Sequence, residues 1–595
     1  MPKTSFAAQI SEHIWRTKYR WCENGHMQEP SIESTWDRVA LAVSAAEVHH
    51  RNDWRERFRA ILADFRFLPG GRILANAGTG REATLFNCFV VGPLEDSVNG
   101  IFNALRDAMV TLQAGGGVGV DFSTLRPAGE HALRTGGTAS GPVSFMQVWE
   151  TANTALESSN LRRGAMMASL RCDHPDIEAF LEAKRAPGAL THFNLSVLLT
   201  DDFMRAVRDD APWPLVFPLG QHPVPPDGEV CQRVWPGRQA AQPCLVYRRV
   251  AARELWDRLL EAEHASAEPG VLFIDRINLS NNLWYCEHLA TTNPCGEVPL
   301  PPWGACNLGS LNLTRFVQHP FGEHPDLDFG GLRAVAAVAT RFLDDVYDIS
   351  PFPLKAQEKA AHASRRIGLG ITGLADALAM LGLAYGSPRS LHLTRQIMSA
   401  VRDTAYRTSV EIAREKNVFP EFDKIKYSAS PFVLGLDHEI QDAILQYGIR
   451  NSHLLAIAPT GSISLLANNV SSGIEPILAR AGRRRVRGAD GRAINFDVLD
   501  DAWRRYQLIH GTDVAAPPAF AEAAEVGAEA QLAMMSEVQT CVDNAIAKTI
   551  RLPASARPAD LGQVLLRAWE LGLKGCAVMR EGIRGTDVVL QSQAA

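Results

Sequence analysis

The sequence lacks several features that would place it in a broad class of protein at once. It has no run of about 18 apolar residues, so we expect no membrane-spanning segment. Its net charge is −6, so no basic excess supports binding to nucleic acid. The N-terminal segment has no apolar core and no small-residue cleavage site, which argues against a secretory signal. These absences predict a cytoplasmic protein that binds neither membranes nor nucleic acid.

Two forms of cysteine grouping are also missing. The chain has 10 cysteines, but none form a Cys-x-x-Cys pair and none lie in a Cys/His cluster with zinc-finger spacing. We therefore predict no metal site among the side chains. A long chain with scattered thiols is expected to be mostly reduced, and an isolated cysteine is most often a small buried hydrophobic residue.

The pattern that is present is typical of an α/β protein. Residues 36–64 have helical periodicity, with Trp36 and Val39 on one face. After a Gly/Pro break, short apolar runs alternate with helical stretches. The runs lie at residues 88–91, 195–199, 271–274 and 454–457. They suit strands buried on both faces, and the helices between them predict a parallel sheet or barrel. We expect a helical region over residues 1–85 and an α/β domain over residues 86–595.

A thiol lies between an amide and a carboxylate in one short segment. Asn293, Cys295 and Glu297 alternate by two, so in an extended segment their side chains would face the same side. Pro294 and Gly296 favour a turn there. The thiol would then have a hydrogen-bonding amide and a candidate general base beside it. From spacing alone, a turn with a capping asparagine and a surface glutamate is an equally good interpretation.

A second segment has the composition of a phosphate-binding loop. The apolar stretch 454–458 is followed by small and polar residues and then by the start of a helix. The loop consists of Pro459, Thr460, Gly461, Ser462 and Ile463. Small residues allow backbone N–H groups to approach a phosphate. In isolation, an ordinary strand-to-helix turn capped by Ser462 explains the pattern more often.

The glycine-rich segment 115–121 invites comparison with a dinucleotide-binding turn. It follows a predicted helix rather than a strand, and it lacks a third glycine at the required spacing. We therefore do not predict a dinucleotide-binding fold.

Taken in order, these segments resemble the catalytic subunit of ribonucleotide reductases. Residues 293–297 resemble the family's finger loop, which lies inside a ten-stranded α/β barrel. Further similar stretches cover residues 85–90, 304–312, 459–464, 470–476 and 542–549. The resemblance implies such a barrel with a central finger loop, preceded by the helical region. It also implies an enzyme that reduces ribonucleotides, expected to be diphosphates, to 2′-deoxyribonucleotides for DNA synthesis.

The resemblance also implies a role for each site residue. Cys295 would carry a thiyl radical, Glu297 would act as the general base, and Asn293 would hold the substrate by hydrogen bonds. Cys88 and Cys306 would supply the reducing electrons and end as a disulfide. The implied substrate-binding residues are Gly71, Asn87, Pro294, Gly296, Pro459, Thr460, Gly461, Ser462 and Ile463.

The subclasses of this family differ in how the radical is made. Class I large subunits carry a tyrosine pair near the C-terminus, whereas residues 572–580 contain no tyrosine. The anaerobic class lacks the glutamate that is present here as Glu297. Residues 68–74 and 163–167 resemble class II sequences, which implies adenosylcobalamin as the cofactor. Two alternatives stay open: a class I-like subunit that needs a radical-generating partner, and a non-catalytic nucleotide-binding paralogue.

The resemblance further implies regulation and partners. A deoxyribonucleoside triphosphate or ATP effector would be bound by loops near 121–137 and 158–164, with Asp121, Arg162 and Arg163 as candidate contacts. The family often binds its effector at a dimer interface, so we expect a homodimer. The chain ends without the usual cysteine pair, so we expect a thiol reductant such as thioredoxin, or a separate cysteine-bearing polypeptide.

Overall fold

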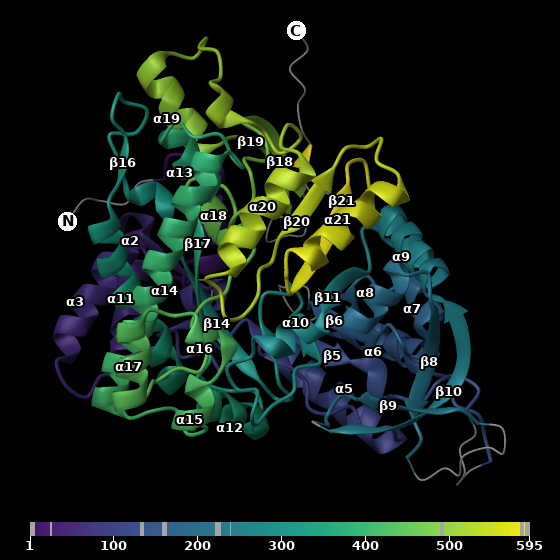
Figure 1. Cartoon of the computed structure of the whole chain (residues 1–595). Coiled ribbons are helices and arrows are strands. Elements are labelled where there is room, and N and C mark those ends of the chain that lie inside the picture. Colours follow the sequence, from purple (N-terminus) through teal and green to yellow (C-terminus); the bar gives the residue numbers. More distant parts are fainter. Residues whose placement is uncertain are drawn as a thin grey trace.

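A computed structural model of the chain describes residues 6–23, 26–130, 136–157, 164–220, 228–238, 240–487, 493–583 and 588–589 (Figure 1). None of the helices in those ranges combines the length and the apolar character that a membrane crossing requires.

The N-terminal region is helical, as its periodicity predicts. It contains α1 (Gln9–Ile14), α2 (Ile32–Val43) and α3 (Arg51–Leu62). Trp36 and Val39 are both buried on the inner face of α2. Helices α2 and α3 lie beside α11 (Phe329–Ile349), on one flank of the molecule (Figure 1). The helical region therefore packs directly on the main domain.

The main domain is built on a ring of strands in two parallel halves. The first half consists of β4 (Cys88–Val90), β5 (Gly117–Asp121), β6 (Met166–Arg171), β7 (Phe193–Leu199) and β11 (Gly270–Phe273). The second half consists of β14 (Ala305–Asn312), β17 (Ile367–Thr372), segment 454–458, segment 545–552 with β20 (Thr549–Leu552), and β21 (Gly575–Arg580). The halves meet in antiparallel pairs, β4 with β14 and β11 with β21. The ring therefore closes, and the predicted ten-stranded α/β barrel is confirmed.

Segment 454–457 differs from the strand that its apolar run predicts. It joins the ring through the bridges of Leu455 with Leu369 and of Ile457 with Ile546, and the N–H groups of Ala456 and Ile457 donate to backbone carbonyls on either side. The backbone N–H groups of Leu454 and Leu455 instead donate to the carboxylate of Asp543, at 2.7 and 2.8 Å. A side chain therefore replaces the backbone as partner for two N–H groups of this segment.

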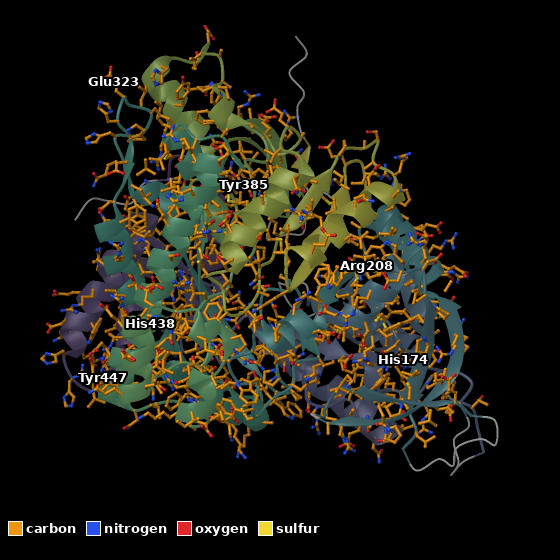
Figure 2. The ribbon with its side chains drawn as sticks, viewed as in Figure 1. His174, Arg208, Glu323, Tyr385, His438 and Tyr447 are labelled. Atoms are coloured by element: carbon orange, nitrogen blue, oxygen red, sulfur yellow. The ribbon has the colours of Figure 1, made fainter. Side chains whose placement is uncertain are left out.

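Helices cover the outside of the barrel, including α5 (Val98–Gln113), α9 (Ala252–Ser266), α14 (Pro388–Lys416) and α21 (Pro558–Glu570). A separate sheet of β8 (Pro212–Pro218), β10 (Ala241–Ala251) and β9 (Val230–Val234) lies beside the first half (Figure 1). His174, labelled in Figure 2, is buried under this sheet with its ring edge-on to Phe217. The sheet thus has its own contact with the barrel.

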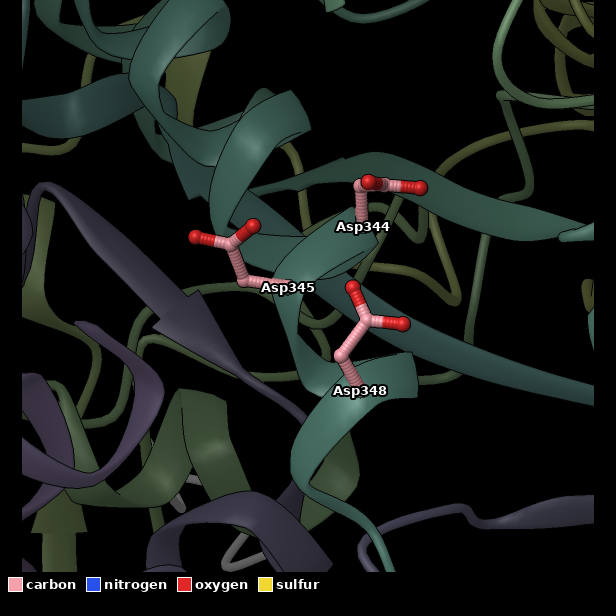
Figure 3. A group of neighbouring side chains, drawn as sticks. All are labelled: Asp344, Asp345 and Asp348. Carbon is pink, nitrogen blue, oxygen red and sulfur yellow. The ribbon is translucent and has the colours of Figure 1, made fainter. Parts of the chain in front are cut away.

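Three aspartates on α11 lie close together (Figure 3). Asp344 pairs with Arg365 at 2.8 Å, Asp345 with Lys416 at 2.6 Å, and Asp348 with Arg365 at 2.9 Å. Burial alone would raise the pKa of Asp344, but the nearby arginines hold it at about 2. The group is therefore an ion-pair network that ties α11 to its neighbours.

Candidate active site at the centre of the barrel

A short hairpin carries the amide, thiol and carboxylate into the barrel. Its strands are β12 (Thr291–Thr292) and β13 (Pro299–Leu300). Between them, the N–H of Gly296 donates to the carbonyl of Asn293 at 3.1 Å, and Gly296 has a φ of 87°. The segment is therefore a tight turn and not the extended stretch that the alternation by two presupposes, because Gly296 adopts a conformation that favours glycine.

The glycine-rich segment makes room for this hairpin. A Cβ atom at Gly119 would lie 1.8 Å from the carbonyl oxygen of Thr292, and one at Gly117 would lie 3.0 Å from Pro294. Any side chain at position 119 would collide with the hairpin backbone. The glycines of β5 therefore serve a close approach of two chain segments.

The hairpin is fixed to both halves of the barrel. The side-chain amide of Asn194, on β7, donates to the carbonyl of Pro294 at 2.7 Å. The N–H of Ala545, in the second half, donates to the carbonyl of Glu297 at 2.9 Å. The turn is held from opposite sides, which limits movement of its side chains.

Four of the predicted catalytic groups form one contact network. The amide nitrogen of Asn293 donates to the sulfur of Cys88 at 3.2 Å, and that sulfur lies 4.0 Å from a carboxylate oxygen of Glu297. Cys306 lies directly opposite Cys88 in the β4–β14 pair. Such cross-strand partners have Cα atoms about 4.5–5.5 Å apart, within the range that a disulfide requires. The barrel thus brings together thiols that are far apart in sequence.

Burial determines the protonation of these groups. It raises the pKa of Glu297 to about 7, and among the described residues Oε2 of Glu297 has no hydrogen-bond partner. Burial, with the nearby Glu297 carboxylate, raises the pKa of Cys88 well above its usual value. Burial likewise raises the pKa of Cys306. At neutral pH both thiols are therefore protonated, and Glu297 is close to its midpoint.

A cavity of about 420 Å³ opens on one side of the turn. It is lined by Asn293, Cys295, Glu297 and Cys88, and by every predicted substrate-binding residue except Gly296. Cys306 is buried in the wall behind Cys88. The cavity is in the usual size range of small-molecule sites.

Hydrogen bonds to residues outside it hold the predicted phosphate loop in place. The hydroxyl of Thr460 accepts from the N–H of Gly473 at 2.7 Å and lies 3.0 Å from the hydroxyl of Thr372. Thr460 has a φ of 49° and directly precedes α18 (Gly461–Leu466). Ser462 therefore lies in the first turn of the helix and is not its cap.

A second cavity, of about 330 Å³, lies against the same turn. Cys295 and Gly296 line it, and Cys295 also lines the first cavity. Much of the remaining wall is made of small residues, including Ala267, Gly270, Ala545, Ala547, Gly575 and Ala577. The exposed Cys295 thus stands between two spaces.

Sequence reasoning missed the cations of the first cavity. Among the described residues that line it, Arg72 and Arg81 are the only basic ones. The guanidinium of Arg72 lies over Gly115, where a Cβ atom would be 2.6 Å from it. Arg72 falls in the class II-like stretch 68–74, so its charge was a signal that could have been used.

Of the three predicted effector contacts, the structure describes only Asp121. The carboxylate of Asp121 accepts from the hydroxyls of Ser123 at 2.6 Å and Ser169 at 3.5 Å, inside the barrel wall. Burial raises the pKa of Asp121 to about 6. Arg162 and Arg163 lie outside the described residues.

A third cavity, of about 380 Å³, lies between the 121–130 segment and the β8–β10–β9 sheet. It combines basic and aromatic side chains. These are Arg126, Arg238, Phe217, Trp235 and Tyr247, and the carboxylates of Asp96 and Glu130 line the cavity beside them. Cations next to aromatic faces are suited to a nucleotide, which offers phosphates and a base.

Comparison with known proteins agrees with this geometry. The family model described as "Ribonucleotide reductase, barrel domain" matches residues 86–579, and "Ribonucleotide reductase, all-alpha domain" matches residues 6–82. A "Vitamin B12-dependent ribonucleoside-diphosphate reductase" of Mycobacterium tuberculosis is 38% identical over 97% of this chain and 80% of the relative. One of Thermoplasma acidophilum with the same description is 31% identical over 98% of this chain and 72% of the relative. A "Ribonucleoside-diphosphate reductase large subunit" of Variola virus is 28% identical over 74% of this chain and 58% of the relative.

Proposed function

The chain belongs to the ribonucleotide reductase family, and from this premise we propose that it reduces ribonucleoside diphosphates to 2′-deoxyribonucleoside diphosphates with adenosylcobalamin. The observation that carries the proposal is the turn of Asn293, Cys295 and Glu297 beside the opposed thiols of Cys88 and Cys306. A phosphate loop lines the same cavity. Substrate, thiol and reductant would therefore meet in one enclosed space.

The overall reaction balances with these groups alone. The ribose loses its 2′-hydroxyl as water and gains a hydrogen at C2′, while two thiols become one disulfide. Cys295, as a thiyl radical, removes the 3′-hydrogen and returns it to C3′ at the end of the cycle, and Asn293 holds the sugar oxygens. Cys88 and Cys306 supply the two electrons and end as the disulfide.

The protonation states support these roles. Glu297, with a pKa of about 7, is ionised in a large fraction of molecules at neutral pH and so can accept the 3′-hydroxyl proton. Because burial raises the pKa of Cys88, this thiol keeps its proton and can give it to the leaving 2′-hydroxyl. The contact between Cys88 and Glu297 places the acid beside the base.

The second cavity fits the cofactor on two counts. Cys295 lines it, and small residues such as Ala545 and Ala577 form part of its wall, so a group bound over its mouth could approach the thiol; its volume of about 330 Å³ is too small to enclose the whole cofactor. When bound, adenosylcobalamin supplies a carbon radical by homolysis of its cobalt–carbon bond, and this radical can oxidise a thiol to a thiyl. Met579 and its neighbours on β21 include no tyrosine that could relay an electron from a partner subunit. This favours the cobalamin enzyme over a class I-like subunit.

The substrate phosphates need compensation of their charge. Arg72 and Arg81 are the basic side chains in the described wall of the cavity. A guanidinium binds phosphate oxygens through paired N–H donors. We infer that Arg72 contacts the diphosphate, because its guanidinium lies over the cavity wall at Gly115.

Regulation is proposed at the third cavity. Arg126 pairs there with Asp96 at 2.7 Å, and a triphosphate could take over part of that contact. The predicted roles of Asp121, Arg162 and Arg163 stay predictions. The effector would be a deoxyribonucleoside triphosphate or ATP.

A second copy of the chain is the proposed partner on α5 and α6 (Pro142–Glu157). Val98, Phe102 and Val148 on these helices are 67%, 49% and 40% exposed. A cluster of exposed apolar side chains often marks an interface. Phe102→Asp should shift a dimer to monomer in sedimentation.

The reductant is proposed to be a small dithiol protein such as thioredoxin, or a separate cysteine-bearing polypeptide, in the cytoplasm.

A turnover assay tests the proposal. The full chain with a ribonucleoside diphosphate, adenosylcobalamin and dithiothreitol should release the deoxyribonucleotide. No product under these conditions, with product only after a metal-containing partner protein is added, would move the chain to class I. No product in either case would favour the non-catalytic paralogue.

A further inference from the structure

A second pair of cysteines lies directly opposite across two strands. Cys231 on β9 faces Cys244 on β10 in their antiparallel pairing. The N–H of Val246 donates to the carbonyl of Glu229 at 2.9 Å, so these two residues form a hydrogen-bonded pair of the ladder. The cysteines lie two residues further along each strand, and because such pairs alternate, they form a hydrogen-bonded pair as well. Cα atoms in such a pair are about 5.5 Å apart, which suits a disulfide.

The same register describes the proposed redox pair of the active site. The N–H of Val90 donates to the carbonyl of Gly304 at 3.0 Å, two residues from the opposed Cys88 and Cys306. The β9–β10 pair therefore repeats a geometry that the chain is proposed to use for reversible disulfide chemistry. It does so on a separate sheet.

The two thiols share one small apolar cluster. Cys244 is buried with Val216 and Trp235, and Cys231 packs against the same cluster while partly exposed. Burial, together with the neighbouring Cys231, raises the pKa of Cys244 to about 12. Burial also raises the pKa of Cys231. The partly exposed Cys231 is thus the thiol that a reagent reaches first, and the buried Cys244 is the second thiol beside it.

This cluster also forms part of the wall of the third cavity. Trp235, which directly follows β9, lines that cavity and donates its indole N–H to the carbonyl of Ser123 at 3.1 Å. Leu245, the neighbour of Cys244, lines it as well. A covalent link between β9 and β10 would therefore restrain both sides of this wall.

We propose that Cys231 and Cys244 form a reversible disulfide that changes the affinity of the third cavity for a nucleotide. The effect on nucleotide binding rests on the effector site proposed above. The oxidant is a low-molecular-weight disulfide. The Cys231 thiolate attacks it and releases one thiol, and Cys244 then attacks the sulfur of Cys231 and releases the second. Two protein thiols are oxidised, one external disulfide is reduced, and both protons pass to the released thiols.

Peptide mapping tests the disulfide itself. The full chain is treated with oxidised glutathione, its remaining thiols are alkylated, and the digest is analysed by mass spectrometry. We expect a peptide cross-linked between Cys231 and Cys244. The exposed Cys22 serves as an internal control and should carry glutathione without any internal cross-link.

Two single variants sharpen the result. Cys244→Ser should accumulate glutathione on Cys231, because the second thiol is absent, whereas Cys231→Ser should leave Cys244 as a thiol. Glutathione on Cys231 of the wild-type chain, with no cross-link, would overturn the proposal. So would unmodified thiols at both positions under conditions that modify Cys22.

Equilibrium dialysis with dATP tests the consequence. Oxidation should change the Kd of the wild-type chain by about fivefold or more, as is typical of coupled sites, and should leave that of Cys231→Ser unchanged. A cross-linked chain with the same Kd as the reduced chain would overturn the regulatory role. Absence of dATP binding by the reduced chain would instead overturn the effector site, and the peptide map would still decide whether the disulfide forms.

Discussion

Replacing Glu297 with glutamine should remove catalysis and stabilise the fold. Burial raises the pKa of this carboxyl from 4.5 to about 7, so its charged form is disfavoured in the folded chain. At about 1.4 kcal/mol per pKa unit, the cost to the free energy of unfolding is roughly 3 kcal/mol above pH 7. Glutamine has nearly the same shape and no charge, so it should recover much of this cost.

The size of this stabilisation depends on pH in a defined way. Below about pH 4.5 the carboxyl is protonated in both folded and unfolded chains, so the variant gains nothing. Between that pH and about 7 the unfolded carboxyl ionises while the folded one stays protonated, so wild-type stability falls with rising pH. The advantage of the variant should therefore grow across this window and then stay constant.

Urea unfolding at pH 5 and pH 8 measures this difference. The midpoint for Glu297→Gln should lie close to that of the wild type at pH 5 and clearly above it at pH 8. Glutamine at the exposed Glu261, on α9, provides the control for the substitution itself. An equal difference between variant and wild type at both pH values would refute burial as the source of the raised pKa.

Three further predictions concern turnover and binding. Cys295→Ser should abolish turnover and leave the substrate Kd nearly unchanged, and substantial multiple turnover would contradict the radical role of this thiol. A single turnover without reductant should leave one disulfide between Cys88 and Cys306 on peptide mapping, and two alkylated thiols there would contradict the pairing. Arg72→Gln should raise the Kd for a ribonucleoside diphosphate roughly 10- to 100-fold, because a hydrogen bond to a charged group contributes about 1.5–3 kcal/mol. Arg72→Lys should retain part of the affinity, and an unchanged Kd in the glutamine variant would exclude a phosphate contact.

Local patterns carried much of the prediction. Apolar runs predicted four of the ten barrel segments, because strands buried on both faces are apolar throughout. The turn of Asn293, Cys295 and Glu297 could be found because its residues are adjacent in sequence. The opposition of Cys88 and Cys306 came only from family resemblance, since strand register is not written in either segment alone.

The features that escaped prediction depend on contacts between distant segments. Gly119 is required by the backbone at Thr292, which lies far along the chain and has no signal near the glycine. Segment 454–457 is apolar like a strand, but the carboxylate of Asp543 accepts from the N–H groups of Leu454 and Leu455. The opposition of Cys231 and Cys244 depends on the register of two strands, which neither cysteine's own segment shows.

The most direct test of the central claim is tritium exchange. Adenosylcobalamin labelled at the 5′ position is incubated with the full chain and a deoxyribonucleoside triphosphate, and tritium release into water is measured. Hydrogen exchange between the cofactor and the exposed thiol of Cys295 predicts release by the wild type and none by Cys295→Ser. Absence of release by the wild type, or equal release by both proteins, would contradict a cobalamin-derived radical at this cysteine.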